Sequence, residues 1–491
     1  MSKDINVLLR SAEQLERSGR LAEAAATYQQ LLATTPGLPD CWYNLARLQK
    51  ALGDFDSALA SYQQALDHRI TGPEEVYLNR GVIYADFLRD DRAAEAALRT
   101  ALALNPDYVP ALLNLANLCE DVGRREESLA LYERLLALAP RNSEALSRYA
   151  SLKGLTGADD LLAVRMRGAI STPATSSIEK ASLGFALGKV LDGCGAYDEA
   201  FSAYSAANQH SLIAASAQPG KQQRVYDAVA HEAQIDKIIA AFPTAQVIPQ
   251  STASMTTRAP IFICGMFRSG STLVEQVLAG HSRVRAGGEL DVIPRLVSRE
   301  LAPFPAHMAT VLAPELHSYA KQYEAHLSRI FPGATLVTDK RPDNFLYIGL
   351  IKRMFPSARI IHTARDPLDN CLSVFFLHLS HRMGYALDLI DTAHFYKQQL
   401  RLMAHWRSLY EDDIFEFDYD RFVHDPRPAV ESLLSFCGLD WEENCLNFQH
   451  VKNTVKTASV WQVREALYQR SSGRWRNYER HLGKLRDYLG R

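Results

Sequence analysis

Pro260-Ile-Phe-Ile-Cys264-Gly265-Met-Phe-Arg-Ser-Gly270-Ser271-Thr272 is the stretch that decides the fold of the second half of this 491-residue chain. Its first five residues form a short apolar run, which predicts a buried strand. The loop that follows carries two glycines, and residues 273–279 have the pattern of a helix. A strand, a glycine loop and a helix in this order form a cradle for an anion, because the loop amides and the helix N-terminus face it. We therefore expect an α/β P-loop domain with a central, mostly parallel sheet.

The loop departs from the usual nucleotide loop at one position. Its Gly-x4-Gly-x-Thr spacing is that of the Walker A loop, but Ser271 stands where that loop has its lysine. Without the lysine the loop is poorly suited to a magnesium-bound γ-phosphate, and Arg268 supplies the cation instead. A purely structural glycine turn is the alternative. The expected anion-binding residues are Arg268, Ser269, Gly270, Ser271 and Thr272.

A second anion-binding element is expected after another strand, residues 358–364. Arg365-Asp366-Pro367 follows this strand, and Pro367 suits the first turn of a helix that contains Ser373. The guanidinium of Arg365 and the hydroxyl of Ser373 could share one phosphate, since both donate hydrogen bonds. The alternative is an aspartate that caps the helix beside an exposed arginine.

The first half of the chain contains a repeat. Gly19 is followed by Ala24 and Tyr28, and Gly53, 34 residues later, is followed by Ala58 and Tyr62. A helix–turn–helix unit with this period resembles the tetratricopeptide repeat, in which each unit buries its apolar face against a neighbour. Units are expected at 5–38, 39–72, 75–108 and 109–142, with a degenerate unit at 181–214.

These observations predict three regions. An α-helical tetratricopeptide-repeat solenoid would span residues 1–157, and the P-loop domain would span 258–491. Residues 158–257 would connect them and carry the degenerate helical repeat. A repeat array of this kind suits a protein or peptide partner.

Charge and cysteine content narrow the function further. The chain has 54 basic and 56 acidic residues, which excludes a uniformly basic nucleic-acid binder, yet residues 452–491 hold 10 basic and 3 acidic side chains. Anion binding is therefore expected in the C-terminal half. Seven cysteines without a Cys-x-x-Cys pair argue against a disulfide framework or a structural zinc site. With no signal peptide and no apolar span in the sequence, the expected location is the cytoplasm, with no membrane span and no metal.

Taken together, Arg268-Ser-Gly-Ser-Thr272 and Arg365-Asp-Pro-x5-Ser373 resemble the sulfotransferase family. The resemblance implies that the first element holds the 5′-phosphosulfate of 3′-phosphoadenosine 5′-phosphosulfate and the second its 3′-phosphate. With the repeats added, the chain looks like a bacterial tetratricopeptide-repeat sulfotransferase.

The tyrosylprotein sulfotransferases are the most similar branch. The segments that resemble them are Gly287-Gly-Glu289-Leu-Asp-Val-Ile-Pro-Arg295, Asp339-Lys340-Arg-Pro342, Tyr419-Asp-Arg-Phe-Val423 and Ser459-Val-Trp-Gln-Val463. The lysine that follows Gln-Val in that branch falls at Glu465, so Arg464 is expected to replace it.

The resemblance implies a role for each matching residue. Glu289 would be the general base for a hydroxyl acceptor, for which protein tyrosine is one candidate. Lys340 and Arg268 would stabilise the charge on the leaving phosphate, with the Ser459 hydroxyl near the same oxygens. Tyr419 and Arg464 would join the nucleotide site. His281 and His362 are rival bases, because cytosolic small-molecule sulfotransferases use a histidine.

Three alternatives stay open. The acceptor could be a small molecule or a carbohydrate rather than a protein. A P-loop kinase would share the loop, although the missing Walker lysine argues against it. A non-catalytic repeat scaffold would not need the matching residues in the C-terminal half.

Overall fold

The computed structural model describes residues 2–154, 157, 160–216, 226–244, 260–379, 383–451, 463–464 and 467–491. The chain divides into two compact units, Met1–Ala145 and Leu146–Arg491. The second unit thus holds both the segment that the sequence analysis treats as a connector and the domain with the glycine loop. Across the described residues, no helix combines the length and the apolarity needed to cross a lipid bilayer.

The first unit consists of helices that pack in consecutive pairs, as the 34-residue period predicts. Tyr28, Tyr62 and Tyr132 are all buried between helices. Gly81 lets two helices approach closely, because a Cβ atom there would lie 2.8 Å from Leu98 Cγ. The helices are α1 (Ser2–Arg17), α2 (Leu21–Thr34), α3 (Pro39–Leu52), α4 (Phe55–Asp67), α5 (Pro73–Val82), α6 (Asp91–Leu104), α7 (Val109–Asp121) and α8 (Arg125–Leu138).

Helices of the degenerate repeat lie in the second unit. Gly188 packs against the ring of Tyr204, where a Cβ atom would come within 2.8 Å of the ring carbons, so the two helices that carry these residues are in close contact. In chain order, the helices from residue 143 to the first strand are α9 (Ser143–Lys153), α10 (Leu161–Ser171), α11 (Ser177–Gly193), α12 (Tyr197–Ser216) and α13 (Ala228–Ala241).

A parallel sheet forms the centre of the second unit, as the sequence predicts. Its strand order is β2-β3-β1-β4-β5, and every pairing is parallel. The strands are β1 (Ile261–Gly265), β2 (Val284–Arg285), β3 (Leu336–Lys340), β4 (Arg359–Ala364) and β5 (Ile414–Asp418). β1 lies between β3 and β4, so the loop that follows it leaves from the middle of the sheet.

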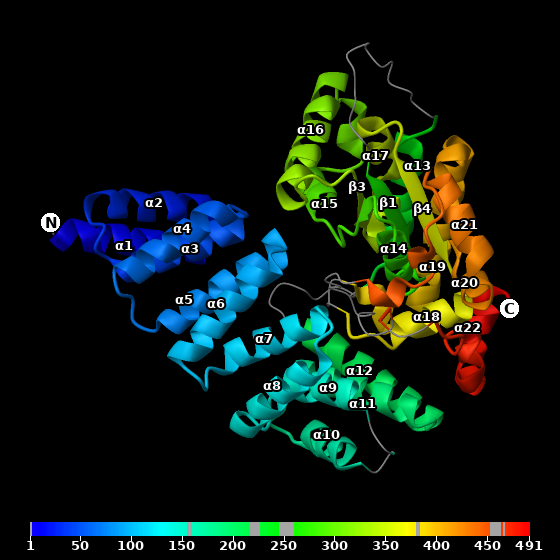
Figure 1. The fold of residues 1–491 in the computed structure, drawn as a ribbon, viewed down its shortest axis with the longest axis horizontal. Helices are drawn as coiled ribbons and strands as arrows, with labels where there is room; N and C mark the ends of the chain where they lie inside the picture. Colours follow the sequence, from blue (N-terminus) through cyan, green and yellow to red (C-terminus); the bar gives the residue numbers. More distant parts are fainter. Residues whose placement is uncertain are drawn as a thin grey trace. The chain divides into compact units, whose positions relative to one another are not determined.

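Two apolar cores cover the two faces of this sheet, and Figure 1 shows helices on both sides of its strands. Phe262 and Cys264 of β1 face one core, whereas Ile261 and Ile263 face the other, which is the alternation expected of a fully buried strand. The remaining helices are α14 (Ser271–Ala279), α15 (Val292–Glu300), α16 (Ala313–Ile330), α17 (Ile348–Met354), α18 (Pro367–Phe375), α19 (Leu389–Leu409), α20 (Tyr419–His424), α21 (Pro426–Phe436) and α22 (Gly483–Leu489).

The degenerate repeat packs directly on the helix that follows β4. Tyr204 of α12 stacks on Phe376, just after α18, with ring centroids 3.9 Å apart. Asn208 Nδ2, also on α12, donates a 2.9 Å hydrogen bond to the carbonyl oxygen of Phe375. The repeat helices α11 and α12 are therefore part of the same packed body as the sheet.

Candidate active site

The carboxyl ends of all five strands meet at one edge of the sheet, the edge at which α/β proteins bind their ligands. The glycine loop follows β1, and Glu289 lies in the segment after β2. Lys340 is the last residue of β3, while Arg365 follows β4 and Tyr419 follows β5. Parallel strands thus bring together residues that are up to 151 positions apart in the sequence.

The glycine loop is tightly folded against its neighbours. Gly265 has φ of +147°, and a Cβ atom there would lie 2.5 Å from the carbonyl oxygen of Thr363. Gly270 has φ of +104°, and a Cβ atom there would lie 2.8 Å from the Tyr419 ring. The Ser269 hydroxyl donates to the Met266 carbonyl oxygen at 2.6 Å and closes the loop. Both glycines are therefore needed for the loop to approach the strand and the tyrosine.

Two arginines meet beside this loop. Nε of Arg268 donates a 3.1 Å hydrogen bond to the Ser373 hydroxyl, and Arg365 Nη1 donates to the Arg268 carbonyl oxygen at 3.2 Å. Burial, and then the charge of Arg365, lower the pKa of Arg268 to about 10. Nε of Arg365 is buried and has no hydrogen-bond partner within the described residues. Two neighbouring cations, one with an unused donor, suit a phosphate or sulfate group.

The sequence left two interpretations of Arg365-Asp366-Pro367. Asp366 does cap α18, since its carboxylate accepts hydrogen bonds from the amides of Leu368 and Asp369. Arg365, however, is only 8% exposed, and its guanidinium lies 4.9 Å from the centre of the Tyr419 ring. The aspartate is structural, and the arginine is buried at the site.

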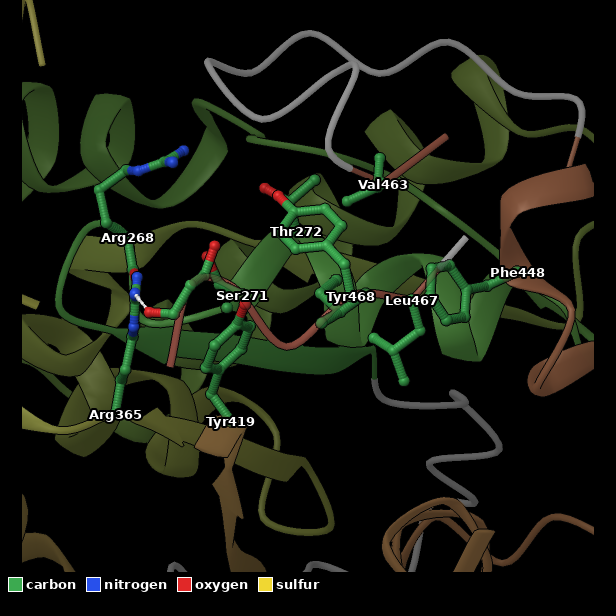
Figure 2. A pocket seen from close by; sticks show the side chains of 12 residues that line it. Arg268, Ser271, Thr272, Arg365, Tyr419, Phe448, Val463, Leu467 and Tyr468 are labelled. Atoms are coloured by element: carbon green, nitrogen blue, oxygen red, sulfur yellow. Dashed lines mark hydrogen bonds between the residues drawn. The ribbon is translucent and has the colours of Figure 1, made fainter. Parts of the chain in front are cut away.

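A pocket with an empty volume of about 610 Å³ opens at this edge (Figure 2). One end is polar and carries Arg268 and Arg365, whereas Phe448 and Leu467 make the opposite end apolar. The lining residues are Arg268, Gly270, Ser271, Thr272, Leu273, Arg365, Tyr419, Phe448, Val463, Leu467, Tyr468 and Ser471. Such a shape suits a ligand with an anionic group at one end and a flat apolar group at the other.

An acid and a cation pair at the same edge. Nζ of Lys340 donates a 2.6 Å hydrogen bond to Oε1 of Glu289, and the lysine side chain is 1% exposed against 35% for the glutamate. The amide of Lys340 also donates to the Gly288 carbonyl oxygen at 3.0 Å. Glu289 is thus fixed by β3 while part of its carboxylate stays open to solvent.

The basic C-terminal segment is fastened at several points. The carboxylate of Asp369 accepts hydrogen bonds from the amides of Gly473 and Trp475, at 2.5 and 2.7 Å. Arg365 donates to the Ser471 carbonyl oxygen. Arg474 forms a 2.7 Å ion pair with Asp192 of α11. The charge of Arg474 therefore pairs with the repeat helix.

Other candidates lie elsewhere. Ser459, Gln462 and Glu465 fall outside the described residues, and Arg464 is half-buried beside the pocket residue Val463. His362 is buried in β4, where burial lowers its pKa to about 3, and His281 Nε2 lies 3.1 Å from the Asp440 carbonyl oxygen. Both histidines are buried, and the ring of His362 also lies within hydrogen-bond distance of Gln399.

Comparisons with known proteins find two kinds of family along the chain. Residues 260–443 match the family model described as sulfotransferase family, and two tetratricopeptide-repeat models match residues 15–69, 43–109 and 92–153. The chain joins tetratricopeptide repeats to a sulfotransferase domain. The matched range of that domain contains the loop after β1, Glu289, Lys340 and Arg365.

Relatives of this repeat-linked sulfotransferase domain are distant. An uncharacterised protein of Aquifex aeolicus is 31% identical over 84% of this chain, which spans 53% of that protein's length. A Caenorhabditis briggsae protein named as a candidate protein-tyrosine sulfotransferase is 22% identical over 38% of this chain and 68% of its own.

Two solved structures have low similarity. The sulfotransferase domain of the Synechococcus PCC 7002 olefin synthase is 20% identical and covers 44% of this chain and 87% of its own, with a TM-score of 0.34. The crystal structure of MamA is 18% identical and covers 45% of this chain and all of its own, with a TM-score of 0.28.

Glu275, a buried acid in the sulfotransferase domain, was not singled out from the sequence. Glu275 lies on α14, one turn after the glycine loop, and is 3% exposed. Its Oε1 accepts hydrogen bonds from the Gly288 amide and the Thr338 hydroxyl. The sequence signal that could have identified it is a charged residue within the mostly apolar stretch 273–279.

Proposed function

We propose that this protein is a sulfotransferase that moves a sulfuryl group from 3′-phosphoadenosine 5′-phosphosulfate to a hydroxyl acceptor. The observation that carries the proposal is the Glu289–Lys340 pair, at the same strand edge as the pocket with Arg268 and Arg365. A base for the acceptor and cations for the donor thus lie on one scaffold.

The donor nucleotide has charge at both ends, and the chain offers a donor set for each. Arg268, Ser271 and Thr272 with the loop amides would hold the 5′-phosphosulfate, and Arg365 and Ser373 the 3′-phosphate. The unused Nε of Arg365 supports this fit, because a buried guanidinium donor needs an acceptor. The apolar end of the pocket would hold the adenine ring of the nucleotide. Tyr419 and Arg464 complete the proposed nucleotide contacts.

In the proposed transfer step, these residues accept the proton and stabilise the charge. The acceptor oxygen forms a bond to sulfur while the bond from sulfur to the bridging phosphate oxygen breaks. The acceptor proton goes to the Glu289 carboxylate, and the electron pair stays on the leaving phosphate. Lys340 and Arg268 offset the charge that grows there, and Ser459 is the proposed hydroxyl donor to the same oxygens. The proposal requires no metal.

A tyrosine of a peptide is the acceptor that we propose. The similarity to the Caenorhabditis protein supports this class, and the repeats support a peptide or protein partner, since arrays of this kind present extended surfaces. A phenol hydroxyl ionises near pH 10, so a single carboxylate base can assist its attack. A cytoplasmic location, without nucleic acid as a partner, remains part of the proposal.

Isothermal titration with 3′-phosphoadenosine 5′-phosphate and with ATP tests the nucleotide. We expect binding of the bisphosphate and weaker binding of ATP, with or without magnesium, because the loop lacks the Walker lysine. Tighter binding of ATP would favour a kinase and overturn the proposal. With labelled donor nucleotide, transfer to tyrosyl peptides but not to the same peptides carrying phenylalanine would support the acceptor. Transfer only to small phenols or sugars would refute the peptide acceptor.

A further inference from the structure

Glu275 joins three segments that meet at the site. It sits on α14, directly behind the glycine loop, and its side chain points into the interior. Its Oε1 accepts a 2.9 Å hydrogen bond from the amide of Gly288 and a 2.7 Å hydrogen bond from the hydroxyl of Thr338. Gly288 immediately precedes Glu289, and Thr338 stands two residues before Lys340.

The hydrogen bonds form a continuous chain through Thr338. The amide of Gly287 donates to the Thr338 hydroxyl at 3.1 Å, and that hydroxyl donates in turn to Glu275. Gly287 lies so close to β3 that a Cβ atom there would stand 2.1 Å from the Thr338 carbonyl oxygen. The segment that carries Glu289 is therefore held against the end of β3 by Glu275 and Thr338 together.

We propose that Glu275 is a positioning residue, which fixes Gly288 and Thr338 so that Glu289 and Lys340 meet in the geometry needed for transfer. This inference rests on the proposed function and deepens it. The two hydrogen bonds that Glu275 accepts come from Gly288 and Thr338. It acts through the backbone of Gly288, which precedes Glu289, and through the side chain of Thr338 near the end of β3.

Electrostatics support the arrangement. Burial raises the pKa of Glu275, whereas the charge of Lys340 and the two hydrogen bonds lower it in part. The charged groups near Glu275 are Lys340, Glu289 and Asp339. Lys340, whose side chain is 1% exposed, is the cation of this group.

An ordinary structural acid would give a different pattern in mutants. If Glu275 only stabilised the fold, its replacement would lower the melting temperature and the amount of active protein, and kcat per active molecule would stay unchanged. If Glu275 positions the two groups, kcat falls while nucleotide binding persists, because Glu275 accepts its hydrogen bonds from Gly288 and Thr338 rather than from the arginines proposed to hold the phosphates. The separation of kcat from nucleotide affinity is thus the decisive measurement.

The variants are Glu275→Gln, Thr338→Val and Thr338→Ser. Glutamine keeps an acceptor oxygen and removes the charge, valine removes the bridging hydroxyl, and serine restores it. We expect Thr338→Val to lower kcat about 10²-fold, since misplaced catalytic groups lose about that much, and Glu275→Gln to lower it less. Thr338→Ser should recover most of the loss. Thr335→Val, which removes a hydroxyl bonded to the Arg283 carbonyl oxygen, is the matched control and should leave kcat unchanged.

Each variant is titrated with 3′-phosphoadenosine 5′-phosphate, and its turnover is divided by the fraction that binds. An unchanged kcat in Thr338→Val and Glu275→Gln would overturn the inference, as would loss of nucleotide affinity in parallel with kcat. If the unaltered protein binds the nucleotide and transfers no sulfuryl group, the proposed function fails instead. The two failures are distinguished by the turnover of the unaltered protein.

Discussion

Lys340 Nζ lies 2.6 Å from Glu289 Oε1, and this pair joins the end of β3 to the segment after β2. The lysine is buried and the glutamate is partly open, so the pair has a protected side and an accessible side. A carboxylate held in this way is already oriented before a hydroxyl approaches, so no further side-chain entropy is lost when the reaction takes place.

Replacing Glu289 with glutamine should remove the base and leave the nucleotide site intact. Because general bases contribute about 10²–10⁴-fold, we expect kcat to fall by that range, with the affinity for 3′-phosphoadenosine 5′-phosphate within about threefold of the unaltered protein. Turnover with labelled donor and isothermal titration measure the two quantities. Glu300→Gln, at the exposed end of α15, is the control. Normal turnover in Glu289→Gln would exclude this residue as the base.

Replacing Arg365 with alanine should instead weaken nucleotide binding. A hydrogen bond to a charged group contributes about 2 kcal/mol, so we expect the dissociation constant of the bisphosphate to rise roughly 30-fold. Arg359→Ala is a matched control, because Arg359 begins the same strand at the opposite edge of the sheet. Equal affinities for the two variants would contradict a phosphate contact at Arg365.

The ion pair between Asp192 and Arg474 should affect both stability and the pocket. Asp192→Asn leaves a largely buried guanidinium without its anion, at a cost of roughly 1–3 kcal/mol, and loosens the segment that carries Ser471 and Tyr468. We expect a lower Tm and weaker nucleotide binding. Asp198→Asn, whose partners Arg480 and His481 have side chains 72% and 25% exposed, should change both less. Similar effects in the two variants would show that the pair does not anchor the pocket.

Asp339 should make stability depend on pH. Burial raises its pKa to about 7, against about 3.9 in an unfolded chain, so the folded protein binds this proton more tightly. Its contribution to the unfolding free energy is therefore complete below about pH 4 and is lost as the pH rises to about 7. Melting curves at pH 5, 6 and 7 should show a weaker decline for Asp339→Asn than for the unaltered protein. Asp412→Asn, on an exposed turn, should keep the original decline; an identical decline in all three proteins would contradict the shift.

Local patterns in the sequence predicted the framework of the fold. The apolar run before Gly265 and the strand before Arg365 depend on neighbours a few positions apart, and the 34-residue period depends on adjacent repeats; all three are confirmed. Glu289 and Lys340 were singled out through family resemblance. That they form a hydrogen-bonded pair depends on strand order, which no short stretch of sequence encodes.

The features that could not be predicted from the sequence depend on contacts between distant segments. Arg474 reads as one more basic residue of the tail until Asp192, 282 positions earlier, is seen beside it. Glu275 likewise looks like the polar side of a helix, because its two partners lie on other segments. Buried polar groups of this kind find their hydrogen-bond partners through tertiary packing, and the periodicity of the sequence does not indicate those partners.

The stacking of Tyr204 on Phe376 has a consequence for exchanging repeats between related proteins. A cut placed at residue 257, where the composition changes, would strip α11 and α12 from α18 and remove Asp192, the partner of Arg474. A cut near Ala145 keeps that packing whole. Chimaeras with a foreign repeat array should therefore replace the chain only up to Ala145. They should retain the native helices α11 and α12, which form one packed unit with the sheet.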